Sequence, residues 1–228
     1  MVSIRTISFD LNSYFEHDDT MIIKQIIVGS MAVCCYIVAC EKTKKAAIID
    51  PGGDEDKLLA EIEKMGLDVE FVIATHGHPD HVCGNRKIQE ATGAKIIMHS
   101  ADELFFGKPE VKNYFSMLGL EPSPAADIEV EEGDEITIGE VKLKVFHTPG
   151  HTPGGICLYN APDLITGDTL FVGGLGRTDF PGGSHQELLT SIRTKLLVLP
   201  PETIIWPGHG YGGQRSTIGE EKSTNPFL

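Results

Sequence analysis

The sequence lacks long apolar runs. No segment approaches the roughly 18 to 20 consecutive apolar residues that a membrane-spanning helix needs. Segment 1–20 has no apolar core of signal-peptide length, and it carries acidic residues where a signal peptide has lysines. We therefore expect a cytoplasmic protein that does not contact a membrane.

Basic residues are also scarce. The 19 lysines and arginines face 33 aspartates and glutamates, which gives a formal net charge of -14. A field of this sign repels the phosphates of nucleic acids, so we expect a small-molecule substrate and no nucleic-acid partner. The 5 cysteines are odd in number and form no CxxC pair. That usage favours reduced thiols over a disulfide framework.

Hydrophobic residues make up 41% of the 228 positions, as in an ordinary globular protein. Two groups of strands occur along the chain, each followed by helices. The predicted strands lie in 21–30, 31–40, 45–53, 69–78, 94–100, 134–151, 154–160, 163–168 and 203–210. The predicted helices are 55–66, 84–93 and 185–199. Asp54 and Ser184 stand at positions suited to cap the helices that follow them. We expect an N-terminal extension of unclear role over 1–20 and a single domain over 21–228, with two sheets face to face and helices outside.

The segment THGHPDH carries the strongest chemical signal. His76, His78, Asp80 and His81 follow directly after a short apolar strand. Imidazole nitrogens suit zinc, iron and related metals, and a carboxylate adds an oxygen ligand. The His-x-His spacing can direct two rings at one ion, and the adjacent Asp80–His81 pair can serve a second one.

Later strand ends supply further candidate ligands. His151, Asp168 and His209 each follow an apolar strand and stand beside glycines, which let the backbone approach an ion closely. His147 competes with His151, because the stretch HTPGHTPG repeats itself. The alternating pattern before His147 places it on the core face, so we interpret His147 as a buried supporting residue and His151 as the ligand.

Four motifs in this order, THGHPDH, GHTPGG, GDTLF and PGHG, resemble the metallo-β-lactamase superfamily over nearly the whole chain after Met21. The resemblance implies an α/β fold, a four-layer αββα sandwich with the metal site at one edge of the two sheets. It also implies two sets of ligands and one residue that bridges them, namely His76, His78 and His151 for one ion, Asp80, His81 and His209 for the other, and Asp168 between them.

Within that superfamily, segments 167–192 and 207–228 look like the glyoxalase II-like, or hydroxyacylglutathione hydrolase-like, branch. The resemblance implies a metallohydrolase, with two divalent ions, that cleaves a small thioester or ester such as a hydroxyacylglutathione. Metal ions lower the pKa of bound water and so supply hydroxide at neutral pH. Asp80 and Asp168 would be the catalytic carboxylates, and Asp80 would orient the hydroxide. Zinc is the favoured metal, and this ligand set also accepts iron or manganese.

The motif GRTDF at 176–180 also resembles the persulfide dioxygenases of the same superfamily. This second resemblance implies a single iron ion held by His76, His151 and Asp168. Ile156 after HTPGG and the stretch DFPGG favour the hydrolase. The alternative function is therefore a mononuclear iron persulfide dioxygenase.

Several other residues allow more than one interpretation. Arg177 could bind a substrate carboxylate or pair with Asp179. We expect Asp50 to support the metal ligands or a turn rather than bind metal itself, His99 to lie at the surface or cap a helix, and Cys83 to have no catalytic role. The aromatic residues of the weakly patterned segment 101–134 either cover the site or fill the core.

Overall fold

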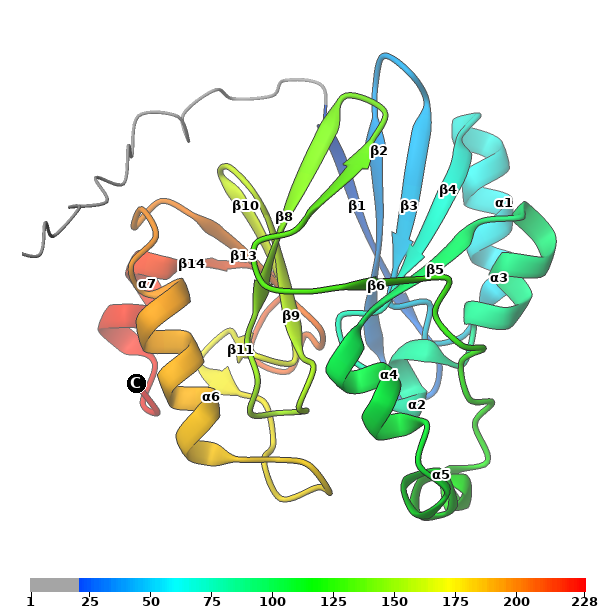
Figure 1. The fold of residues 1–228 in the computed structure, drawn as a ribbon. Helices are drawn as coiled ribbons and strands as arrows, with labels where there is room; N and C mark the ends of the chain where they lie inside the picture. Colours follow the sequence, from blue (N-terminus) through cyan, green and yellow to red (C-terminus); the bar gives the residue numbers. More distant parts are fainter. Residues whose placement is uncertain (1–20) are drawn as a thin grey trace, which may run out of the picture.

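The computed structural model describes residues 21–228, and the expected N-terminal extension 1–20 lies outside them (Figure 1). Two six-stranded sheets form the centre of the described part. The first runs in the order β1-β2-β3-β4-β5-β6, with the bounds Met21–Val28, Val33–Cys40, Lys45–Ile49, Asp68–Ile73, Lys95–His99 and Ile128–Val130. The second runs in the order β14-β13-β10-β9-β8-β7, with the bounds Ser216–Thr217, Ile204–Pro207, Asp163–Gly167, Ile156–Asn160, Val141–His147 and Glu135–Ile138.

Helices supply the connections that parallel strands require. In the first sheet β3, β4, β5 and β6 are parallel, and α1 (Glu55–Met65) links β3 to β4. The connection from β4 to β5 contains α2 (Pro79–Val82) and α3 (Asn85–Thr92). The weakly patterned segment that follows forms α4 (Ser100–Phe106) and α5 (Pro109–Phe115).

The hydrophobic core lies in three layers, which confirms the αββα arrangement. Strand β2 illustrates the cause, because all eight of its residues are buried. Cys34, Tyr36 and Val38 face the second sheet, whereas Cys35 and Ile37 face α1 and α3. A strand covered on both faces has no solvent side, so its sequence is apolar without interruption. The third layer packs the second sheet against α6 (His185–Ser191) and α7 (Ile218–Thr224).

Two predictions about helix starts have different outcomes. Ser184 caps α6 as expected, because its hydroxyl accepts a hydrogen bond from the Glu187 N–H. The prediction for Asp54 is wrong: it precedes α1 but makes no capping bond, and its carboxylate accepts from the Gly29 N–H at 3.0 Å. That contact ties the start of α1 to the turn between β1 and β2.

The ends of four strands meet at one edge of the sandwich. Strands β8, β10 and β13 run in the same direction, so the loops after them emerge together. The loop after β4 joins them across the two sheets, because the Ile156 N–H donates to the Thr75 carbonyl at 2.8 Å. The Cys34 N–H donates to the Gly208 carbonyl, also at 2.8 Å. All loops that carry the predicted ligands therefore emerge at this edge.

Within residues 21–228, no helix combines the length and apolar character that a bilayer span demands. All five cysteines fall in this range and are free thiols.

Two histidines, one at the end of β5 and one at the end of β8, stack on each other. The His99 and His147 ring centroids are 3.9 Å apart, with an angle of 18° between the rings. His99 caps α4 by accepting from the Ala101 N–H at 3.1 Å, but it is buried and not on the surface. Half-buried His147 donates from Nε2 to the Pro153 carbonyl at 2.9 Å. Burial lowers the pKa of His99 to about 4, and the neighbouring His147 reinforces this shift.

This lowered pKa predicts a loss of stability in acid. Between pH 6.5, the ordinary pKa, and about pH 4, the unfolded chain binds a proton at His99 that the folded chain does not bind. The free energy of unfolding is therefore highest above pH 6.5 and decreases as the pH falls toward 4. The decrease due to His99 is on the order of 1–2 kcal/mol, once partial solvent screening is allowed for. His99→Asn keeps an acceptor for Ala101 and should remove this loss. Urea unfolding of chelator-treated protein at pH 7 and pH 4.5 measures it, with exposed His185→Asn as the control. An identical pH dependence in wild type and His99→Asn would contradict the assignment.

Candidate metal centre

The loop after β4 turns sharply where it carries the first histidines. His76 and His78 flank Gly77, and a Cβ atom at Gly77 would lie 2.2 Å from the Phe106 ring. Glycine is therefore the residue that fits between the two ligands. Pro79 then begins the short helix α2, which presents Asp80 and His81 from its first turn. The motif thus folds as one compact turn with four buried polar side chains facing the sheet edge.

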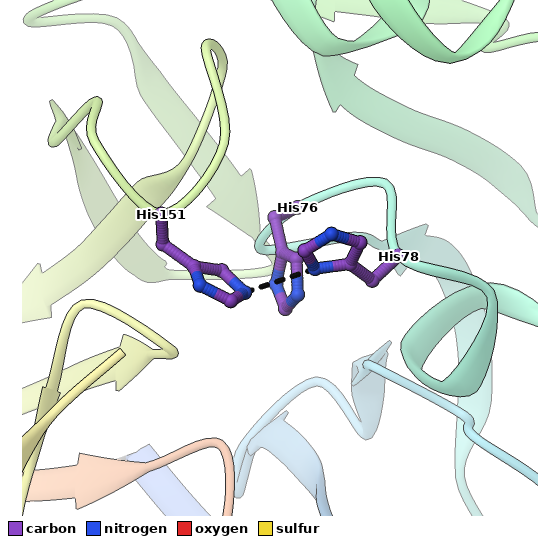
Figure 2. A group of neighbouring side chains, drawn as sticks. All are labelled: His76, His78 and His151. Atoms are coloured by element: carbon purple, nitrogen blue, oxygen red, sulfur yellow. Dashed lines mark hydrogen bonds between the residues drawn. The ribbon is translucent and has the colours of Figure 1, made fainter. Parts of the chain in front are cut away.

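Three histidines form a first group of candidate ligands. His76, His78 and His151 place ligating nitrogens within 4.8 Å of one another, and all three are buried. Figure 2 shows His151 approaching from its own loop toward the other two rings, with His151 Nε2 2.9 Å from His78 Nδ1. Burial and the neighbouring imidazoles hold the pKa values of His76 and His78 well below the usual range. The rings are therefore neutral, which is the state that binds metal.

A second group lies beside the first. Asp80, His81 and His209 also place ligating atoms within 4.8 Å of one another. The Nε2 atoms of His81 and His209 are 3.1 Å apart, and an Asp80 oxygen lies 3.5 Å from His209 Nε2. Burial lowers the pKa of His81, but the Asp168, Asp80 and Asp50 carboxylates outweigh this and raise it to about 10. This half of the site thus has an excess of buried negative charge, which a cation would balance.

Asp168 lies between the two groups. Its Oδ2 is 3.6 Å from His151 Nε2 and 3.7 Å from His209 Nε2, and its Oδ1 is 3.5 Å from His81 Nε2. The backbone confines this carboxylate, since a Cβ atom at Gly208 would lie 2.1 Å from Asp168 Oδ1. One carboxylate oxygen therefore faces the second group alone, and the other faces both groups.

All seven residues predicted as ligands converge, and His147 is outside both groups. Several atoms at the convergence have no hydrogen-bond partner among the described residues, namely His76 Nε2, His78 Nε2, Asp168 Oδ1 and His209 Nδ1. A buried polar atom without a partner costs roughly 1–3 kcal/mol, and a bound ion can remove part of this cost by accepting lone pairs. Five imidazoles and two carboxylates in two adjoining groups fit two divalent ions.

Hydrogen bonds from outside the groups orient three of the rings, and the first joins His76 Nδ1 to the Thr75 hydroxyl at 3.1 Å. Asp50 accepts from His81 Nδ1 at 2.9 Å and from the Thr75 N–H and hydroxyl at 2.7 and 2.6 Å. Both Asp50 oxygens are thereby occupied, so Asp50 is a supporting residue although it lies near His76. His151 Nδ1 donates to the Arg177 carbonyl at 2.6 Å, which leaves Nε2 directed into the site.

Asp102 is a supporting residue that the sequence did not reveal. It is fully buried at the start of α4. Its Oδ2 accepts from the Gly77 N–H and the Thr152 hydroxyl, both at 2.8 Å, and its Oδ1 accepts from the Gly154 N–H at 2.5 Å. Asp102 thus connects the loop of His76 and His78 with the loop of His151.

Arg177 and Cys83 lie at the margin of the site. Arg177 forms two hydrogen bonds to the Asp179 carboxylate, at 2.9 and 2.7 Å, and lies 4.2 Å from the Phe180 ring centroid. Burial raises the pKa of the Cys83 thiol to about 11, so the thiol is protonated at neutral pH and is a poor nucleophile.

The contacts of Asp102 predict a specific defect in Asp102→Asn. The asparagine NH2 group would face at least one of the groups that now donate to the Asp102 carboxylate, which are the Gly77 N–H, the Thr152 hydroxyl and the Gly154 N–H. Because two donors repel each other, the two ligand loops should separate. We expect cobalt(II) affinity, followed by its visible absorption, to fall by roughly 10- to 100-fold. Asp127→Asn is the matched control, because Asp127 also accepts a backbone N–H, that of Ile96, but away from the site. A destabilised Asp102→Asn protein with unchanged cobalt affinity and spectrum would show that Asp102 supports only the fold.

Comparison with known proteins agrees with this geometry. A protein of uncharacterised function from Aquifex aeolicus is 43% identical over 91% of this chain and 97% of its own length. A protein named hydroxyacylglutathione hydrolase GloC, from Haemophilus influenzae, is 39% identical over 81% of this chain and 88% of its own.

Solved structures are similar as well. The BLEG-1 B3 metallo-beta-lactamase has a TM-score of 0.83 at 34% identity, covering 91% of this chain and 99% of that one. ETHE1 from Myxococcus xanthus has a TM-score of 0.78 at 31% identity, covering 90% and 84%. TTHA1623, solved in a di-iron-bound form, has a TM-score of 0.77 at 32% identity, covering 90% and 100%. The metallo-beta-lactamase superfamily profile matches residues 29–209, and the chain belongs to this superfamily.

Proposed function

We propose that the protein is a dinuclear metal-dependent hydrolase that cleaves a small thioester or ester, such as a hydroxyacylglutathione. The observation that carries this proposal is the convergence of two buried ligand groups on Asp168. The likeness to the relative named hydroxyacylglutathione hydrolase GloC supports the choice of substrate class.

When bound, two divalent ions would lower the pKa of water and polarise the substrate carbonyl. The chain's own residues hold the reacting groups in place. Asp168 fixes the separation of the two ligand groups. Burial alone would raise the pKa of Asp80, but His81, His209 and His78 keep it well below its usual range. Asp80 is therefore ionised at neutral pH, and it can accept a hydrogen bond from the attacking water. Water adds to the carbonyl carbon, the carbon–sulfur bond breaks, and a carboxylate and a thiol leave.

Zinc is the favoured metal, and iron or manganese also suit this mixed set of imidazoles and carboxylates. A solved relative in a di-iron-bound form keeps iron among the candidates. The net charge of -14 and the five free thiols support a cytoplasmic enzyme for small molecules that has no nucleic-acid partner.

A second candidate is a mononuclear iron persulfide dioxygenase. Two observations favour it: the segment 176–180 reads GRTDF, and the chain is 31% identical to ETHE1 from Myxococcus xanthus. That reaction would use His76, His151 and Asp168 and would leave His209 without a ligand role. In this structure His209 faces His81, Asp80 and Asp168 at 3.1–3.7 Å, which favours two ions.

Asp168→Ala tests the bridging role. We expect wild-type protein to bind two zinc ions per chain and to hydrolyse S-lactoylglutathione. Asp168→Ala should lose zinc and at least about 100-fold in kcat/KM, since it removes the carboxylate shared by both ligand groups. Metal analysis and thiol release measure the two effects. Asp56→Ala removes an exposed carboxylate on α1 and serves as the control. Retained zinc and activity in Asp168→Ala would overturn the proposal.

His209→Gln separates the two candidate functions. In a dinuclear hydrolase it should lower the metal content from two ions to one and reduce thioester hydrolysis. In a mononuclear dioxygenase, iron-loaded His209→Gln should consume oxygen with glutathione persulfide as fast as wild type. Oxygen uptake by both proteins, without thioester hydrolysis, would replace the hydrolase with the dioxygenase.

A further inference from the structure

Exposed apolar side chains gather beside the metal centre. Nine large apolar residues are exposed in the part of the chain that the structure describes. Five of them line a single cavity, which is also lined by five of the seven candidate ligands; the five apolar residues are Met31, Tyr114, Met117, Leu118 and Tyr211. Met117 is 79% exposed and Tyr211 is 71% exposed. A concentration of exposed apolar surface at one pocket is typical of a binding site.

The cavity has a volume of about 260 Å³ and a polar floor. His78, Asp80, His151, Asp168 and His209 form the floor. Aromatic side chains stand around it: the Phe115 and Phe180 ring centroids lie 5.1 and 5.5 Å from that of His78, and Phe171 lines another wall. A ligand would therefore place its reactive group at the floor and the rest of its structure against apolar walls.

Positive charge is scarce around this cavity. Apart from the histidines of the floor, Arg177 is the one basic residue among its described lining residues. Two hydrogen bonds already join Arg177 to the Asp179 carboxylate. An acyl group that carries a carboxylate would find no further cation along these walls, whereas an alkyl or aryl acyl group would bury the exposed Met117 and Leu118 side chains.

We propose that this cavity selects thioesters and esters with an apolar acyl group, a short alkyl chain or an aromatic ring, over those with a hydroxyacyl group. This inference rests on the proposed function. The acyl group would lie against the walls that Phe115, Phe180 and Leu118 form. Hydrolysis consumes one water, breaks the bond between the carbonyl carbon and sulfur, forms a bond between that carbon and the water oxygen, and releases the apolar carboxylate, the thiol and one proton.

A series of S-acylglutathiones with one thiol and different acyl groups tests this selectivity. We expect kcat/KM to rise from lactoyl to butanoyl to hexanoyl, by up to about fourfold per buried methylene. The double variant Met117→Ser, Leu118→Ser should flatten this rise. Val198→Ser is the matched control, because Val198 is 70% exposed and does not line the cavity. Hydrolysis of the lactoyl compound with no rise toward hexanoyl would overturn the inference and leave the proposed function intact.

Calorimetric titration of zinc-loaded protein with hexanoate and acetate gives a readout without turnover. Hexanoate should bind at least about tenfold more tightly than acetate, and the double variant should lose this difference. Selective hexanoate binding without hydrolysis of any thioester would support the apolar cavity and reject the proposed function. Equal affinities for hexanoate and acetate would overturn the inference.

Discussion

The structure depends on one electrostatic constraint: five imidazoles and two carboxylates, all of them buried, lie together. Such a group without a cation leaves buried lone pairs unpaired and concentrates negative charge around His81. Two divalent ions would satisfy both requirements at once. Asp168 makes the two groups one centre, because its carboxylate reaches His151 on one side and His81 and His209 on the other.

The sandwich holds this arrangement by simple means. Parallel strands bring the ligand loops to the same edge, and the bond from Cys34 N–H to the Gly208 carbonyl joins the two sheets there. Two buried carboxylates then fix the loops themselves. Asp50 holds His81 and Thr75, while Asp102 holds the backbone at Gly77 and Gly154. These supports keep flexible, glycine-rich loops in a geometry that their own sequences do not impose.

Features with a local cause could be predicted from the sequence. The compact HGHPDH motif and the glycine-flanked His151, Asp168 and His209 follow strands whose apolar patterns are clear, and these strand ends meet. Asp102 could not be found in this way, because its partners lie 25 to 52 residues away and no motif marks them. Asp54 stands at the position of a helix cap, but its carboxylate accepts a hydrogen bond from the Gly29 N–H instead of from the helix. The apolar cavity could be predicted only in part. The aromatic residues of segment 101–134 were candidates to cover the site, and Tyr114 and Phe115 do line the cavity beside the ligands, whereas no pattern in the sequence marks Met117 and Leu118.

We propose that the two ligand groups hold two ions joined by Asp168. Anomalous diffraction at the zinc edge from crystals of zinc-loaded protein tests it most directly. We expect two anomalous peaks, one among His76, His78 and His151 and one among Asp80, His81 and His209, with Asp168 contacting both. A single peak at saturating zinc, or two peaks with Asp168 contacting neither, would contradict it.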